Sequence, residues 1–190
     1  MRCLLLSSVL LFLSFGILTT SSFAQQSIGT PPHPPEHLTG LTQSVLSTEL
    51  RSARGRSFRL ADHSGQVLVI HLFATWCGPC HFETPALVRL HKQFRSKKVR
   101  IVALSTEDPD ASNVLVRRWI RTYAVPYRVG WAPDEFALTL FREGITPQTL
   151  IISRSGRIVR RFIGYSTAKT AAQLKVAIKE ALNEKLIAHQ

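Results

Sequence analysis

The stretch that decides the fold reads Val67-Leu68-Val69-Ile70-His71-Leu72-Phe73-Ala74-Thr75-Trp76-Cys77-Gly78-Pro79-Cys80-His81-Phe82-Glu83-Thr84-Pro85. Residues 67–73 are apolar apart from His71 and rich in β-branched side chains, which predicts a strand buried on both faces. After Trp76, residues recur at spacings of four, three and four, which is one face of an amphipathic helix: Glu83, Leu87, Leu90 and Phe94. The stretch therefore predicts a buried strand that leads directly into a helix.

Two cysteines lie where this helix begins. Pro79 falls in the first turn, where a missing N–H costs little. Unpaired backbone N–H groups and the helix dipole favour a thiolate there and lower the pKa of Cys77, which makes Cys77 the expected nucleophile. Cys80 lies one turn further along the helix, close enough to attack a mixed disulfide formed on Cys77. This spacing favours two-thiol exchange chemistry.

Other chemistries use the same C-x-x-C spacing. Half of a zinc site has it, but the only other cysteine is Cys3, and no suitably placed histidine pair supplies the second half. Cys77, Cys80 and His81 also spell the C-x-x-C-H attachment signature of c-type haem. Met1 is the only methionine, so a His/Met axial pair is impossible, whereas a His/His pair stays open. A purely structural disulfide is a further alternative, and a redox dithiol is favoured over all of these.

The same residues carry a family resemblance. Trp76-Cys77-Gly78-Pro79-Cys80 after a hydrophobic strand resembles thioredoxin. The continuation Cys80-His81-Phe82-Glu83-Thr84-Pro85 resembles the C-x-x-E-x-P pattern of the TlpA/ResA/CcmG (DsbE) group of exported bacterial thiol:disulfide oxidoreductases. The resemblance runs from about Ser57 to Ile187. It implies an α/β, thioredoxin-like fold with a central mixed sheet flanked by helices, an N-terminal β-hairpin and a central α–β insertion.

The hydrophobic pattern sets the expected order of the remaining elements. A hairpin is expected within residues 46–60, ahead of the core strand, with a turn at 62–65. After the core strand and its helix, the pattern predicts a strand at 99–104, a turn at 106–110, a helix at 111–123, a strand at 127–129 and a helix at 134–142. It then predicts strands at 148–153 and 157–163 and a helix at 168–187 with Thr167 as its N-cap.

The resemblance also implies a substrate-binding surface. It makes Pro147 the cis-proline that faces the dithiol, so that the backbone of Thr146 would meet an extended substrate segment in a β-like contact. Trp76, Gly78 and Pro79 belong to the same expected surface. An ordinary trans proline that opens a strand is the alternative for Pro147.

Three further side chains near the dithiol could carry chemistry. Glu83 shares the apolar helix stripe, so we expect a desolvated carboxyl with a raised pKa that exchanges a proton with Cys80, as the resemblance also implies. The alternative is a surface glutamate that complements the helix dipole. His71 stands six residues before Cys77 and is interpreted as a hydrogen-bonded core histidine rather than one that tunes the dithiol. His81 is expected to be an exposed helix residue that modulates the Cys77 thiolate.

The chain divides into three expected parts. Residues 1–24 have the basic start, apolar centre and small-x-small end of a signal peptide, with an uncleaved membrane anchor as the alternative. Residues 25–43 form a proline-rich linker, and residues 44–190 form the thioredoxin-like domain. This organisation predicts a periplasmic location, with a membrane tether if the leader is retained.

Charge and motif content limit the partners. The net charge is +12, yet no aromatic-lined nucleic-acid motif accompanies the arginines, so solvated basic faces are expected and no nucleic acid. No flavin- or nicotinamide-binding signature is present, so we expect no cofactor. His33 and His37 in the linker are too few for a metal site, and none is predicted.

The sequence therefore predicts an enzyme that reduces disulfides. Expected substrates are protein cysteines or disulfides, such as those of apocytochrome c or of a copper site, with electrons from a membrane thiol donor. The alternative is a metallochaperone that holds a soft metal ion on Cys77 and Cys80.

Overall fold

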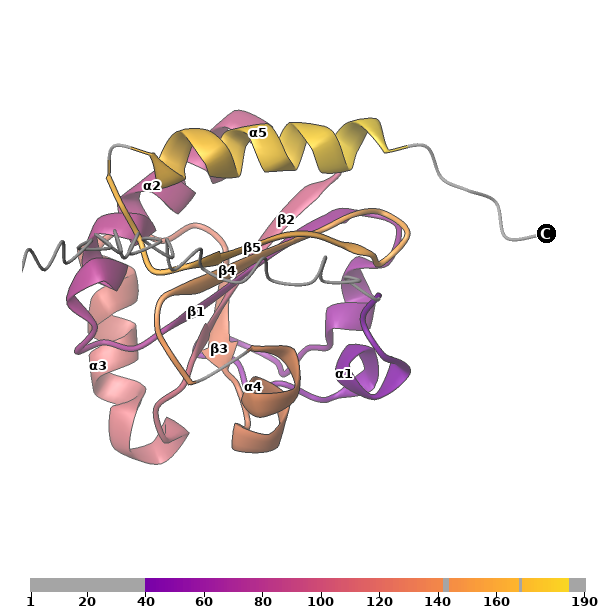
Figure 1. Ribbon diagram of the computed structural model, residues 1–190. Helices are drawn as coiled ribbons and strands as arrows, with labels where there is room; N and C mark the ends of the chain where they lie inside the picture. The colour runs from indigo at the N-terminus through magenta and orange to yellow at the C-terminus, as the bar shows by residue number, and fades with distance from the viewer. Residues whose placement is uncertain (1–39, 142–143, 168, 185–190) are drawn as a thin grey trace, which may run out of the picture. The chain divides into compact units, whose positions relative to one another are not determined.

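A computed structural model describes residues 40–141, 144–167 and 169–184. In this part of the chain, a five-stranded sheet has the order β3-β2-β1-β4-β5 (Figure 1). The strands are β1 (Val67–Phe73), β2 (Val99–Ser105), β3 (Arg128–Trp131), β4 (Gln148–Ile152) and β5 (Ile158–Ile163). β1 runs parallel to β2 and antiparallel to β4, β2 runs parallel to β3, and β4 runs antiparallel to β5. The predicted mixed sheet is confirmed, with β1 at its centre.

Helices cover both faces of this sheet. They are α1 (Gln43–Ser47), the 3-10 helix η1 (Leu60–His63), α2 (Gly78–Phe94), α3 (Pro109–Thr122), α4 (Asp134–Leu140) and α5 (Thr170–Asn183). In Figure 1, α2 and α5 lie above the strands, and α1 and α4 lie below them. The predicted α/β architecture, a mixed sheet flanked by helices, is thus confirmed.

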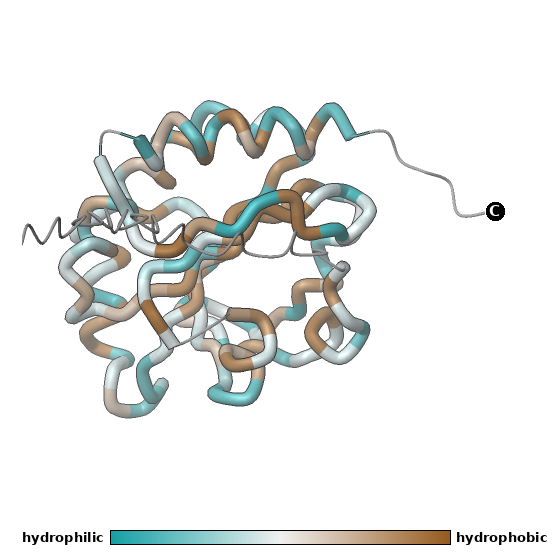
Figure 2. Tube along the Cα trace, in the orientation of Figure 1, coloured by the Kyte–Doolittle hydropathy of each residue, from teal (hydrophilic) through white to brown (hydrophobic). Residues whose placement is uncertain are grey.

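β1 divides the core in two, because successive side chains of a strand point to opposite faces. All seven of its residues are buried. Val67, Val69 and Phe73 pack with residues of α2, α3 and α5, whereas the intervening positions 68, 70 and 72 pack with residues of α1, η1 and α4. Figure 2 shows the result along α5, where hydrophobic and hydrophilic residues alternate because only one side of the helix meets the sheet.

The predicted hairpin at 46–60 is largely absent. α1 occupies its start, with Thr42 as N-cap, and the rest is reduced to a single bridge in which Leu50 and Phe58 exchange backbone hydrogen bonds of 2.8 and 3.1 Å. The segment between them pairs with β3 instead: Ala53 N donates to Val129 O at 2.9 Å. Hydrogen bonding of this segment to the edge strand of the sheet competes with hairpin formation, in which the segment would have to pair with itself.

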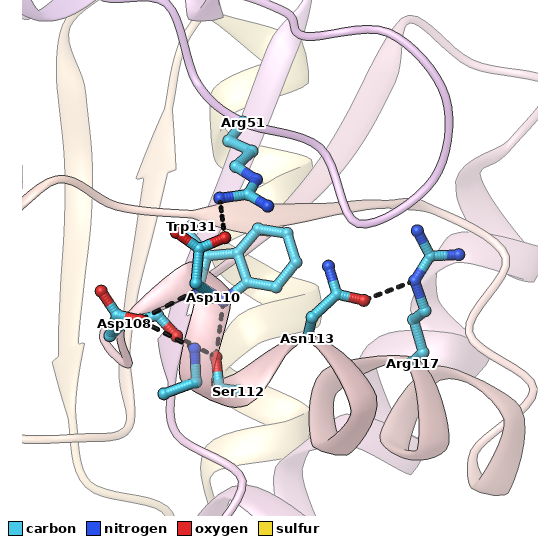
Figure 3. Close-up of polar contacts among 8 residues, drawn as sticks. Arg51, Asp108, Asp110, Ser112, Asn113, Arg117 and Trp131 are labelled. Carbon is cyan, nitrogen blue, oxygen red and sulfur yellow. Dashed lines mark hydrogen bonds and ion pairs between the residues drawn. The ribbon is translucent and has the colours of Figure 1, made fainter.

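This edge contact brings two backbones close together. A Cβ at Gly130 would lie 2.3 Å from the carbonyl oxygen of Arg51, so only glycine fits. The Arg51 guanidinium reaches α3 and forms an ion pair with Asp110 at 2.8 Å (Figure 3). In the same view, Trp131 Nε1 donates to Ser112 Oγ at 2.9 Å. Contacts at this point therefore join three parts of the fold: the segment around Arg51, β3 and α3.

Some helix boundaries differ from those predicted. α3 begins at Pro109, inside the predicted turn, because Asp108 accepts hydrogen bonds from the backbone N of residues 110 and 111 (Figure 3). α4 ends at Leu140 rather than at 142. α5 begins at Thr170, so Thr167 is not its N-cap; the Thr170 hydroxyl instead accepts from Ser166 N at 2.9 Å.

The leader and most of the predicted linker, residues 1–39, lie outside the described residues. Within the described residues, none of the helices combines the length and the apolar character needed to cross a membrane.

Candidate active site

The two cysteines form a disulfide at the start of α2. β1 ends at Phe73, and a short loop then brings Cys77 to the N-cap position, where its sulfur accepts a hydrogen bond from Cys80 N at 3.3 Å. The Cα atoms are 5.3 Å apart. Cys77 is 4% exposed and Cys80 is fully buried, so the first cysteine is the more accessible one.

Several residues next to the two cysteines in the sequence are exposed, although the disulfide itself is nearly covered. Trp76 is 74% exposed and Phe82 is 63% exposed, although both are large and hydrophobic. Gly78 and Pro79 are also exposed, in the first turn of α2. A solvent-facing apolar rim next to a reactive group is typical of a surface that meets another molecule.

The Thr146–Pro147 peptide bond is cis, as the family resemblance implied. β4 starts one residue later, and its Gln148 is paired with Leu72, so Pro147 lies opposite the carboxyl end of β1. That end is the one from which the chain continues to Cys77. Among the described residues, the backbone of Thr146 forms no hydrogen bond, which leaves both of its polar groups for a partner.

Glu83 points into the protein interior, as predicted. The residue is 1% exposed, and its Oε1 accepts a 2.7 Å hydrogen bond from the Thr149 hydroxyl. Burial raises the pKa of Glu83 to about 7, and the Thr149 hydrogen bond opposes this rise. Because residues three apart share one helix face, the carboxyl lies on the same side of α2 as Cys80. The predicted interior position of the carboxyl is thus confirmed, and a role in proton exchange stays a proposal.

His71 is a core histidine that belongs to the same network. It is fully buried, and its register partner across β1 and β4 is Thr149, whose hydroxyl lies 3.2 Å from His71 Nδ1. Since the Thr149 proton is donated to Glu83, we assign the Nδ1–H tautomer, in which His71 donates to Thr149. Burial lowers the pKa of His71 to about 3, so the ring is neutral near neutral pH. Its 3.7 Å approach to Glu83 Oε2 is therefore not an ion pair.

His81 is not the exposed residue that was predicted. Its ring is half-buried between α2 and α3, where Nδ1 lies 2.6 Å from the Tyr123 hydroxyl and Nε2 lies 3.0 Å from Thr75 O. A carbonyl only accepts, so Nε2 carries the proton and Nδ1 accepts from the tyrosine. His81 thus fixes the loop ahead of Cys77 against α3.

Glu107 fixes the same loop from the other side, and the sequence analysis missed it. Its carboxylate accepts from Thr75 N at 2.7 Å, from Thr75 Oγ1 at 2.6 Å and from Ser105 Oγ at 2.9 Å. The available signal was its position two residues after the end of β2, since the carboxyl ends of parallel neighbouring strands meet at one edge of a sheet.

A pocket of about 360 Å³ opens beside this loop. It is lined by Thr75, Trp76, His81, Glu107, Leu115, Arg118, Trp119, Thr122 and Tyr123. The described residues include no group of three or more His, Cys, Asp or Glu side chains that could hold a metal ion.

Comparison with known proteins agrees with this geometry. The chain is 28% identical to the thiol-disulfide oxidoreductase ResA of Bacillus subtilis (strain 168) over 118 residues, which is 62% of this chain and 64% of ResA. Among solved structures, a thiol:disulfide interchange protein of the thioredoxin family from Chlorobium tepidum TLS has a TM-score of 0.62 at 24% identity, covering 71% of this chain and 92% of that one. A secreted Mycobacterium tuberculosis disulfide oxidoreductase homologous to E. coli DsbE has a TM-score of 0.63 at 15% identity, covering 73% and 99%.

These similarities confirm the resemblance to the TlpA/ResA/CcmG group, and the two solved structures show the thioredoxin-like fold. The chain spans 64% of the length of the ResA proteins of Bacillus thuringiensis (strain Al Hakam) and Bacillus subtilis (strain 168). A model of the AhpC/TSA family matches residues 41–161, which is more than half of the sequence. The chain therefore belongs to the AhpC/TSA family.

Proposed function

We propose that this protein is a thiol:disulfide oxidoreductase that reduces protein disulfides through Cys77 and Cys80. The observation that carries the proposal is the Cys77–Cys80 disulfide at the N-terminus of α2, with the buried carboxyl of Glu83 on the same helix face. The names of the ResA and DsbE-like relatives support it.

The reaction starts from the reduced enzyme. The Cys77 thiolate, favoured by the helix N-terminus, attacks one sulfur of a client disulfide. The client S–S bond breaks, one client thiolate leaves and takes up a proton, and a mixed disulfide joins the client to Cys77. The Cys80 thiol then gives its proton to the Glu83 carboxylate and attacks the Cys77 sulfur. The mixed disulfide breaks, the second client sulfur leaves as a thiolate and takes up a proton, and two electrons have passed to the client as the Cys77–Cys80 bond forms.

Glu83 suits the second step because its pKa lies close to neutral pH. A group with a pKa near the working pH can both accept and return a proton. The burial that raises this pKa comes from the packing of α2 on the sheet. In the reverse direction, the protonated carboxyl would return its proton to the Cys80 thiolate.

The client is held beside the dithiol. The backbone of Thr146, next to the cis Pro147, offers hydrogen bonds to an extended client segment. The exposed Trp76, Gly78 and Pro79 supply contact surface around the sulfur. The proposed clients are exported proteins with paired cysteines, such as apocytochrome c or copper-site proteins.

The proposed location is the periplasm, reached through the leader at residues 1–24, with a membrane tether if that leader is retained. An exported dithiol needs an electron source, and we assign this role to a membrane thiol donor. The secreted mycobacterial disulfide oxidoreductase of similar fold supports an extracytoplasmic location.

Trapping of the mixed disulfide tests the function. In Cys80→Ser, the client attacked by Cys77 should stay covalently attached, so a thiol-sensitive adduct should form that mass spectrometry can identify. Cys77→Ser is the matched control and should trap nothing. Insulin reduction by the wild-type protein should be lost in both variants. Retention of a soft metal ion without insulin turnover would contradict the proposal and favour a metallochaperone.

A further inference from the structure

A second pocket, far from the dithiol, is lined by five basic side chains. It has a volume of about 390 Å³ and lies between η1, the end of α2 and the starts of β2 and β3. Arg54, Arg100, Arg128, His63 and His91 line it, and among the described residues no carboxylate does. We call it the basic pocket.

The three arginines are positioned without being neutralised. Arg54 Nη2 donates to the carbonyl oxygens of residues 125 and 127 at 3.0 and 3.1 Å, and Arg100 Nη1 donates to the carbonyl oxygen of residue 99 at 3.0 Å. The Arg128 guanidinium carbon lies 4.9 Å from the centre of the Phe58 ring. In the described part of the chain, none of the three forms an ion pair. Hydrogen bonds to carbonyl oxygens and contact with a ring face hold a guanidinium in place without cancelling its charge. Several of its five N–H donors stay available to a ligand.

The pKa values of the two histidines reflect the positive charge around them. Burial lowers the pKa of His63, and the charges of Arg128 and Arg100 lower it further, while Asp62 opposes them. Burial and the charge of Arg100 also lower the pKa of His91, with a contribution from Arg95. His63 Nε2 is buried and has no hydrogen-bond partner among the described residues. The basic pocket therefore combines fixed positive charge with a lining histidine, one ring nitrogen of which has no partner among the described residues.

We propose that the basic pocket binds a phosphate-bearing anion, either a free phosphate ester or the headgroup of an anionic phospholipid. A phosphate group has several oxygens and can accept hydrogen bonds from more than one guanidinium at a time. A carboxylate has only two oxygens, and one guanidinium that donates two parallel hydrogen bonds occupies both of them. The volume falls in the range of small-molecule sites and exceeds what one phosphate fills, so a phosphate with a small polar substituent fits.

The position of the basic pocket would determine how the protein is oriented on a membrane that it binds. Arg100 lies at the amino end of β2, and the parallel strand β1 leads away from that end toward Cys77. The seven residues of β1 span roughly 20 Å. A lipid headgroup held in the basic pocket would therefore keep the dithiol on the side of the molecule that faces away from the membrane surface.

Calorimetric titration with glycerol 3-phosphate and with inorganic phosphate at constant ionic strength tests the proposal, using the full chain. Arg100→Gln and Arg128→Gln should each weaken binding by roughly tenfold, because each removes a charge-assisted donor. Arg117→Gln removes the same charge from an exposed site on α3 and should change binding by less than about twofold. Equal melting temperatures would establish that the variants are folded. Arg100→Lys, which keeps the charge but loses the fork, should bind with intermediate affinity.

Two further readouts sharpen the test. Phosphate should raise the pKa values of His63 and His91 in NMR titrations of the wild type and not in Arg128→Gln. Sedimentation with phosphatidylglycerol vesicles then distinguishes the two sources. A headgroup site predicts that Arg100→Gln and Arg128→Gln lose vesicle binding and that Arg117→Gln does not. A free phosphate ester predicts that all three variants bind the vesicles equally, while only the two pocket variants lose affinity for glycerol 3-phosphate. Absence of saturable phosphate binding, or an equal effect of Arg117→Gln on it, would overturn the proposal.

Discussion

Replacement of Glu83 by glutamine tests the buried carboxyl directly. The amide of the Glu83→Gln variant keeps an oxygen that can accept the hydrogen bond of 2.7 Å from the Thr149 hydroxyl, so the fold should be retained. The difference between the variant and the wild type lies in ionisation. The pKa of Glu83 rises from its ordinary 4.5 to about 7 on burial, which corresponds to about 3 kcal/mol between the two protonation states.

The sign of the effect follows from proton binding. Below pH 4.5 the carboxyl is protonated in both the folded and the unfolded chain, and ionisation costs nothing. As the pH rises through the folded pKa of about 7, the folded protein gives up a proton that the unfolded chain has already lost, so the stability that protonation supplied is gone. The free energy of unfolding of Glu83→Gln should therefore exceed that of the wild type by about 3 kcal/mol more at about pH 8.5 than at about pH 4.5.

Urea unfolding of the oxidised protein across this pH range measures the difference. Glu135→Gln, which changes an exposed glutamate in the first turn of α4, is the matched control and should stay within about 0.5 kcal/mol of the wild type at every pH. In single-turnover reduction, Glu83→Gln should slow attack by Cys80 by about a hundredfold and flatten the pH–rate profile near neutral pH. A stability difference that is the same at the acidic and the alkaline end would refute the buried, ionisable carboxyl.

Two further substitutions test the surroundings of the site and of the fold. Thr149→Val removes the donor to Glu83, so NMR titration should give a still higher Glu83 pKa, and urea unfolding should give a loss of about 1–3 kcal/mol; an unchanged pKa would contradict the assigned hydrogen bond. Gly130→Ala places a Cβ against Arg51 O and should lower the free energy of unfolding by more than about 2 kcal/mol. A Cβ at residue 78 would meet open space, so Gly78→Ala serves as the control. Equal melting temperatures for the two variants would speak against the close approach of the two backbones.

The dithiol, its strand and its helix were predictable because their signals are local. The apolar run of β1 and the spacing of Glu83, Leu87 and Leu90 lie within a single element each, and both are buried as expected. The interior position of the Glu83 carboxyl followed from the same stripe. The cis peptide bond at Pro147 came from the family resemblance rather than from any pattern in the residues themselves.

What escaped prediction depends on register and on contacts between distant segments. Thr149 meets Glu83 only because β4 pairs with β1 so that Thr149 lies opposite His71, and no local pattern fixes that register. Glu107, which follows β2, meets Thr75, which follows the neighbouring strand β1, for a similar reason. The hairpin was predicted from turn residues alone, whereas the edge of β3 offered the segment around Ala53 a better partner.

Under the proposed function, the burial of the dithiol would limit which proteins can serve as clients. Sulfur exchange requires an approach in line with the S–S bond, yet Cys77 is 4% exposed and lies beside the protruding ring of Trp76. A thiol or disulfide buried beneath the surface of a finished globular domain is thus sterically barred. Under the same proposal, the clients able to reach Cys77 would be chains that have not completed folding or whose cysteines lie on projecting loops. The shape of the rim would thereby spare structural disulfides in mature neighbours.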